Sequence, residues 1–208
     1  PAPKAAFVDE LGKRLAKKSA RPAAAWAFSV FESEAVETAS FPPARVAIST
    51  GALKAVENEA QLAALLGHEL GHLLDGSFEK QIASMRHNLC VPLATVKAYE
   101  AEGMADSLPR GIGGAGSAAT LDAMARDTMK MRLMMGAGRA AELDADRVAF
   151  ELLVAGGYET RELEKAIERA GTIANHPPAT ERSKAIAELR AKANPPKGKS
   201  PPLPKNLK

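Results

Sequence analysis

Apolar residues recur every three to four positions along most of the chain, which is the spacing of a helix with one buried face. In the first such segment, residues 3–19, Leu11 and Leu15 lie on one face and lysine and arginine residues lie opposite. A mostly helical protein is therefore expected. The same reading predicts further helices over residues 59–75, 78–101, 124–135, 139–155, 159–171 and 179–193.

The pattern differs between residues 24 and 50, where short runs rich in β-branched and aromatic residues replace the helical spacing. Two of these runs, AWAFSVFE and ARVAIST, are separated by Pro42 and Pro43. Runs of this kind bounded by turn residues predict strands. We expect a fold of the α+β class, mostly α, in which a small antiparallel sheet of two or three strands lies beside the helix that follows.

Polar and glycine residues mark where these elements begin and end. Asn58 followed by Gln61 resembles a capping box at the start of a helix, and Gly76 favours its end. Residues 103–117 are rich in glycine and predict either a lid or a plain connector. The last residues, NPPKGKSPPLPKNLK, predict disorder, so we expect one domain over residues 1–194 and a tail over residues 195–208.

Composition narrows the class of protein. The 208 residues carry a net charge of only +3, part of it in the basic tail, which gives no support to nucleic-acid binding. A single cysteine, Cys90, excludes an internal disulfide. No apolar run reaches the roughly 18 residues that a transmembrane helix needs. The methionines between residues 124 and 135 favour core packing, with contact to unfolded substrates or to a membrane surface as the alternative.

The chemistry lies in the segment HELGH, His68 to His72, in a chain with only four histidines. On a helix, residues four apart lie one above the other, so His68 and His72 can direct ring nitrogens at one metal ion. Glu69 is rotated about 100° from His68 and can reach a water molecule beside that ion. This is the arrangement of zinc peptidases, in which the glutamate is the general base. The alternative is a buried helix with two hydrogen-bonded histidines.

A catalytic zinc site needs a third protein ligand. The segment RAAELDADRVAF offers Glu142 as that ligand, and small alanines beside it would let its helix approach the HELGH helix closely. Asp146, one helical turn further on, can accept a hydrogen bond from a ligating histidine. Asp75 and Glu79 are rival ligands, although reaching back to the metal from their positions would be awkward.

A simpler interpretation of RAAELDADRVAF is a solvated acidic face. Its acidic residues would then point into solvent, and Arg139 and Arg147 would be their ion-pair partners. The presence of HELGH in the same chain favours the metal site.

Three segments, HELGH, the helix bearing ELDAD, and HPPATER at residues 176–182, together resemble peptidase family M48. This is a family of zinc metallopeptidases that includes HtpX-like bacterial envelope proteases, and the similarity covers roughly residues 24–190. The resemblance implies a zincin-like helical domain with one Zn²⁺ per chain. It implies His68, His72 and Glu142 as zinc ligands and Glu69 as the general base.

The resemblance also implies roles for residues outside the ligand set. Asp146 would support His68, and Arg182 would anchor the HPPATER segment. His176 would lie at the cleft, and it is our candidate for a catalytic oxyanion donor. Two alternatives for His176 are a fourth ligand that keeps the enzyme latent and a residue that only begins a helix.

The chain departs from the family pattern before the HELGH helix. Glu37 stands where the family commonly has asparagine, and Pro43 and Ala44 stand where it has two glycines, so the turn should be stiffer. These changes affect the substrate cleft and not the metal ligands. We expect the strand ARVAIST to offer an edge on which an extended peptide substrate adds by main-chain pairing.

The expected function is that of a zinc-dependent endopeptidase that hydrolyses unfolded, membrane or envelope proteins. Its partners would be protein or peptide substrates and not nucleic acid, with association to a membrane surface possible. The expected location is the bacterial cell envelope, periplasmic or membrane-tethered. The competing hypothesis is a chaperone-like or adaptor protein with the same fold and a blocked zinc site.

Overall fold

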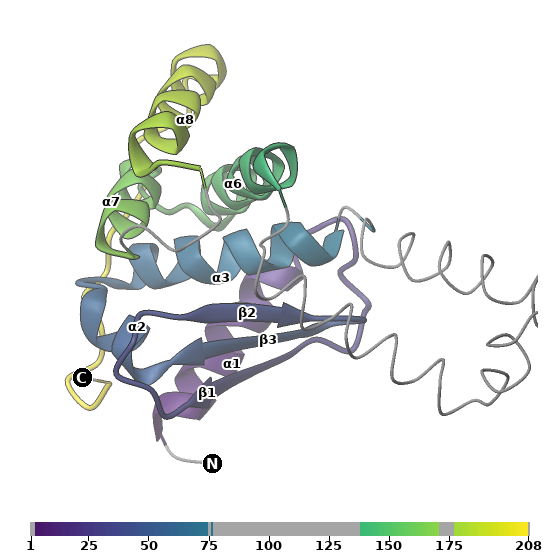
Figure 1. The fold of residues 1–208 in the computed structure, drawn as a ribbon, viewed down its shortest axis with the longest axis vertical. Coiled ribbons are helices and arrows are strands. Elements are labelled where there is room, and N and C mark those ends of the chain that lie inside the picture. Colours follow the sequence, from purple (N-terminus) through teal and green to yellow (C-terminus); the bar gives the residue numbers. More distant parts are fainter. Residues whose placement is uncertain (1–2, 75, 77–137, 171–176, 208) are drawn as a thin grey trace, which may run out of the picture. The chain divides into compact units, whose positions relative to one another are not determined.

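The computed structural model describes residues 3–74, 76, 138–170 and 177–207 (Figure 1). The segments on either side of the gap at 77–137 belong to one packed unit. The predicted helices over 78–101 and 124–135, the glycine-rich segment 103–117 and Cys90 lie outside the described residues. In the part of the chain that is described, no helix has the length and apolar character needed to cross a membrane.

Helices dominate the described residues, as their apolar spacing predicts. The structure forms each helix that was predicted for these residues and begins or ends it within a few positions of the expected boundary. The short helix α2 was not predicted. The helices are α1 (Pro3–Ala16), α2 (Thr50–Ala55), α3 (Glu59–Leu74), α6 (Arg139–Gly156), α7 (Arg161–Ala170) and α8 (Ala179–Ala193).

Three strands form the sheet: β1 (Ala27–Phe31), β2 (Thr38–Phe41) and β3 (Arg45–Ser49). Their order is β1-β3-β2, with β1 parallel and β2 antiparallel to β3. The sheet is therefore mixed, and the antiparallel sheet expected from the sequence is wrong. The reason is that TASF, a run of only four residues, forms a hairpin with β3. β1 must then pair with the other side of β3, where its direction is parallel.

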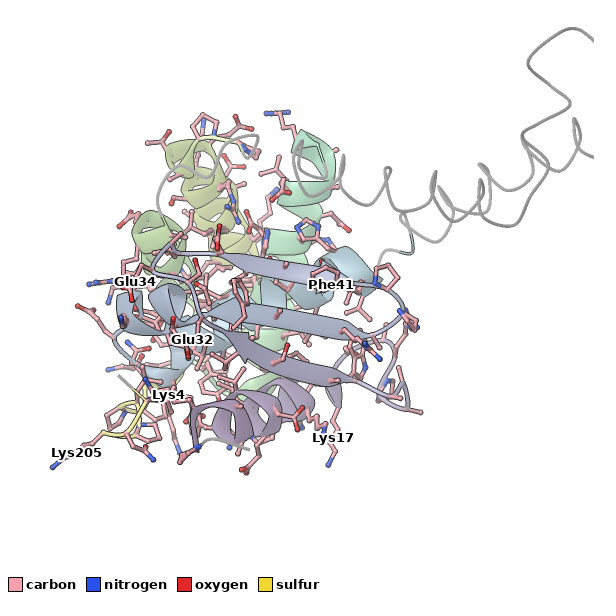
Figure 2. The ribbon with its side chains drawn as sticks, turned by 60° about the horizontal axis from the view of Figure 1, so that its bottom comes forward. Lys4, Lys17, Glu32, Glu34, Phe41 and Lys205 are labelled. Atoms are coloured by element: carbon pink, nitrogen blue, oxygen red, sulfur yellow. The ribbon has the colours of Figure 1, made fainter. Side chains whose placement is uncertain are left out.

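One face of the sheet is buried under α1 and α3. Val46 and Ile48 of β3 are buried on this face. Phe28 is the cross-strand partner of Val46 and Thr38 is the partner of Ile48, so both lie on the same face. The ring of Phe28 lies against Gly12 of α1, and α3 covers β2. Figure 2 shows the sheet with Phe41 at the end of β2. The packing therefore places the HELGH helix, α3, directly against the edge strand.

The central element is α3, in which almost every residue is buried. It contacts β2, α1, α6 and α7, and α6 runs along it (Figure 1). At its start, the Asn58 side chain accepts a hydrogen bond from the Gln61 N–H at 2.9 Å, as the capping box predicts. The Gln61 side chain accepts a hydrogen bond from the N–H of Glu57, whereas a capping box would use the N–H of Asn58. Gly76, just past the helix end, has a φ of 63°, a left-handed conformation that suits glycine.

The C-terminal segment is ordered in the structure, in contrast to the disorder predicted for residues 195–208. Its main chain pairs with the domain at two places: Pro201 accepts the Glu59 N–H at 2.8 Å, and Lys199 donates to Gly157 at 2.9 Å. Leu207 is only 1% exposed, whereas Lys205 points away from the domain (Figure 2). Composition alone missed this segment because its few apolar side chains and main-chain hydrogen bonds depend on surfaces built elsewhere.

Replacing Leu207 by alanine should lower the free energy of unfolding by about 2–4 kcal/mol, because the change leaves a cavity in the core. The melting temperature should fall by several degrees. Leu203 lies in the same segment but is only partly buried, so Leu203→Ala is the matched control and should cost less. Thermal unfolding of the three proteins measures the difference. Equal melting temperatures for all three would show that the segment contributes no stability.

Candidate metal centre

Two helices bring together three side chains that could hold a metal ion. His68 and His72 lie one turn apart on α3, and Glu142 lies in the first turn of α6. The three side chains belong to residues that are 6%, 9% and 1% exposed, respectively. Their burial means that each polar group must find a partner in the interior. The contact between α3 and α6 thus joins residues that are far apart in the sequence.

The distances between the donor atoms fit one metal ion. His68 Nε2 lies 3.1 Å from His72 Nε2 and 3.2 Å from Glu142 Oε2, and His72 Nε2 lies 3.5 Å from Glu142 Oε1. Two ligands that each lie about 2.0–2.1 Å from a tetrahedral zinc ion are about 3.3 Å apart. Two imidazoles and a carboxylate are also donors that zinc accepts. Among the described residues, this is the one group of three with such spacing.

Asp146 and Arg182 orient the first of these histidines. Asp146 Oδ1 lies 2.8 Å from His68 Nδ1. Arg182 donates to both oxygens of the same carboxylate, from Nη2 at 2.6 Å and from Nε at 2.7 Å. Because an ionised carboxylate only accepts, His68 carries a proton on Nδ1, and its Nε2 faces His72 and Glu142. Arg182 Nη2 also lies 3.2 Å from His68 Nδ1, but both groups are donors and do not bond to each other.

The same contacts set the charges of these groups. Burial would lower the pKa of His68, but hydrogen bonds to Asp146 and Glu142 outweigh burial and raise it to about 9. Burial would raise the pKa of Asp146, but hydrogen bonds with Arg182 and His68 hold it below its ordinary value. The pKa of Arg182 is raised, because its bonds to Asp146 outweigh its burial. Asp146 therefore stays ionised at neutral pH and remains an acceptor for His68.

Small residues allow α6 to come close enough to α3 for Glu142 to reach the histidines. A methyl group added at Gly71 would lie 2.7 Å from Ala145 Cα, and one added at Gly67 would lie 3.2 Å from Ala149 Cα. The first distance is a clash with the main chain, and the second is a tight contact. The alanines predicted to permit a close approach thus face glycines of the HELGH helix.

Replacing Gly71 by alanine should push α6 away from α3 and weaken metal binding. Overpacking of this kind costs about 1–3 kcal/mol. If the helix pair moves, zinc affinity should fall about tenfold or more. Gly67→Ala is the matched control, because its added methyl group meets a less severe contact. Competition with a zinc chelator measures both affinities, and a Gly71→Ala protein with native affinity would contradict the close-approach argument.

Glu69 is buried beside His68 on α3, with an exposed fraction of 4%. Its Oε1 accepts a hydrogen bond from Thr38 Oγ1 at 2.7 Å. Thr38 begins β2, a strand that the sequence analysis did not identify, and no residue pattern in TASF points to this contact. The Thr38 hydroxyl can be placed on the helix side of the sheet only when the pairing of Thr38 with Ile48 is known.

The strand that lies beside the metal residues is β2 and not β3. β3 has a neighbour on each side, so the expectation that ARVAIST offers a free edge is wrong. Among the described residues, no strand pairs with the other edge of β2, so the free edge on this side belongs to β2. A hollow with mainly apolar walls opens next to it. Its lining comes from β2 and the residues just before it, and from α3, α7 and α8; it includes Val36, Thr38, Leu65, His68, Leu163 and Arg182.

The structure describes only some of the other residues that were predicted for the site. His176, Asp75 and Glu79 lie outside the described residues. The solvated acidic face is present only in part: Asp144 is partly exposed and pairs with Arg147 at 2.7 Å, whereas Glu142 is buried. Arg139 pairs with Glu181 of α8 at 2.5 Å and not with the acidic residues of its own helix.

Comparison with known proteins gives one family. The family model described as "Peptidase family M48" matches residues 2–190, which is most of the chain and includes every residue of the site described above. The match ends before the C-terminal segment that packs against α3. No curated protein matches the chain significantly.

Proposed function

Because the chain belongs to peptidase family M48, and is therefore a metallopeptidase, we propose that it is a zinc-dependent endopeptidase in which His68, His72 and Glu142 hold the ion. The observation that carries the proposal is the closeness of the three side chains: the two Nε2 atoms are 3.1 Å apart, and each lies 3.2–3.5 Å from an oxygen of Glu142, which suits a tetrahedral ion. Asp146 and Arg182 support the ligands by fixing the ring of His68.

Zinc, when bound, supplies a Lewis acid that polarises the substrate carbonyl and lowers the pKa of a water molecule to about 7. In our proposal, Glu69 accepts a proton from the attacking water and later passes it to the nitrogen of the leaving amine. Its place directly after His68 and its buried carboxylate support this role. His176 remains the candidate donor to the developing oxyanion, on the resemblance alone.

The free edge of β2 is our proposed binding place for an extended substrate. Ser49 donates its N–H to Glu37 at 2.9 Å, so residue 37 forms a hydrogen-bonded pair with β3. Such pairs alternate along an antiparallel ladder, so the N–H and C=O groups of Thr38 and Ser40 face away from β3. A peptide that adds there would pass Glu69, since Thr38 contacts it.

Extended peptides bind an edge through main-chain groups, which favours unfolded segments as substrates over folded proteins. We propose membrane or envelope proteins as the natural source of such segments and the bacterial cell envelope as the location. Both proposals rest on the resemblance to envelope proteases.

Zinc content and chelator-sensitive cleavage of an unfolded protein test the proposed function together. We expect about one zinc ion per chain, cleavage of an unfolded substrate, loss of cleavage with a chelator, and recovery when zinc is returned. A protein that binds zinc and the unfolded substrate without cleaving it would favour the adaptor alternative. A protein that binds no zinc would overturn both.

A further inference from the structure

The carboxylate of Glu69 has a specific hydrogen-bond donor in β2. Thr38 Oγ1 lies 2.7 Å from Glu69 Oε1, and the two residues come from different elements, 31 positions apart in the sequence. Glu69 is 4% exposed, so little of its carboxylate is open to water. Hydrogen bonds to an ionised carboxylate are shorter and stronger than those between neutral groups. The contact is therefore strong enough to decide how this carboxylate is oriented.

The sheet holds the donor in place. Thr38 pairs with Ile48 of β3, a residue that is fully buried, and it shares the buried face of the sheet. A β-branched side chain has few χ1 conformations, so the direction of the hydroxyl follows from the strand. Since α3 packs on β2, the hydroxyl meets the carboxylate of Glu69 without further movement.

We propose that Thr38 is a positioning residue: its hydroxyl holds Oε1 of Glu69 and leaves Oε2 as the oxygen that exchanges protons during hydrolysis. The inference rests on the proposed function, in which Glu69 is the general base. Without this bond, the carboxylate could rotate about its last torsion and present either oxygen. With the bond, one oxygen is held as an acceptor and the other is free.

The proton steps are consistent with this assignment. One O–H bond of the attacking water breaks while its oxygen bonds to the substrate carbonyl carbon, and a bond forms between the released proton and Oε2 of Glu69. Glu69 is then a neutral acid, whose carbonyl oxygen, Oε1, still accepts from Thr38. Next the bond from Oε2 to the proton breaks, an N–H bond forms on the leaving amine, and the C–N bond of the substrate breaks. Thr38 keeps its own proton throughout and only orients the base.

Kinetics of Thr38 variants test the proposal. Thr38→Val keeps the β-branched shape and removes the hydroxyl, whereas Thr38→Ser keeps the hydroxyl. We expect Thr38→Val to lower kcat about tenfold or more, with KM within about twofold of native and full zinc content. Thr38→Ser should restore kcat to within about threefold of native. A merely structural role would not produce this split or this rescue.

Thr50→Val is the matched control. Thr50 is another threonine whose hydroxyl lies next to a carboxylate, with its Oγ1 3.2 Å from Glu32 Oε2, but it lies away from the metal residues. The same change there should leave kcat unaltered. A Thr38→Val protein with full zinc and native kcat would overturn the proposal.

Crystal structures of the metal-free native and Thr38→Val proteins give a readout that does not need activity. The Glu69 carboxylate should keep one orientation in the native and Thr38→Ser proteins and should rotate or become split in Thr38→Val. An unchanged carboxylate in Thr38→Val would overturn the proposal. If the native protein binds zinc but cleaves nothing, the proposed function fails, and the crystal structures still decide whether Thr38 positions Glu69.

Discussion

Glu69→Gln should bind zinc as the native protein does and should hydrolyse peptides about 10² to 10⁴ times more slowly. Glutamine has the same shape as glutamate, so it can fill the buried site on α3. Its amide can still accept a hydrogen bond from Thr38, but it cannot take a proton from the attacking water. The kcat/KM for a quenched fluorescent peptide measures the loss, and metal analysis of the same sample measures zinc.

Glu162→Gln is the matched control for this change. Glu162 is also buried, at 5% exposed, and accepts hydrogen bonds from Asn58 and Gln61 at the start of α3. Its replacement should alter the melting temperature but not kcat/KM at a temperature where the protein is folded. Near-native hydrolysis by Glu69→Gln would remove Glu69 from the mechanism.

Loss of the Glu142 carboxylate should reduce hydrolysis as strongly as the Glu69→Gln change, but by weakening zinc binding. Glu142→Ala should weaken zinc binding by more than the roughly 10–100-fold that follows loss of an outer hydrogen-bond partner. Hydrolysis should be lost at zinc concentrations that saturate the native protein and return only in part at higher ones. Titration with zinc against a competing chelator gives the affinity, and the peptide assay gives the activity.

Asp144→Ala is the control on the same helix, because Asp144 is a partly exposed carboxylate that pairs with Arg147. It should leave zinc affinity unchanged, since a surface ion pair of this kind contributes little. If Glu142→Ala kept native zinc affinity, the third ligand would have to be another carboxylate. Asp75 and Glu79, the rival ligands, would then be the next residues to substitute by alanine.

Sequence reasoning predicted the three residues that the structure brings together, because their spacing within each helix is local. The four-residue spacing of His68 and His72 is a property of one helix, and Glu142 and Asp146 share the same spacing on another. The resemblance to a known family indicated that the two helices contribute to one site. The glycine–alanine contacts that let them approach were visible only in part, since alanine spacing was noted and Gly71 was not.

What the sequence did not reveal depends on partners distant in the chain. TASF alternates polar and apolar residues over only four positions, and its polar residues Thr38 and Ser40 are the ones paired with the buried Ile48 and Val46, so β2 could not be recognised until β3 was beside it. The mixed sheet and the free edge follow from that pairing, and so does the contact between Thr38 and Glu69. Similarly, Leu207 in a proline-rich tail indicates burial only when the surface that receives it is known.

The hydrogen bond between His68 and Asp146 spans 78 positions of the chain, and the bond from Arg182 to Asp146 spans another 36. Closing loops of this length costs entropy before the contacts form, so the ligand set should assemble late in folding, after the individual helices. A metal ion would then meet at most the two histidines of α3, and not the complete set of three side chains, in the early, partly collapsed chain. We expect zinc to leave the refolding rate almost unchanged and to slow unfolding, which makes the ion a determinant of lifetime more than of folding speed.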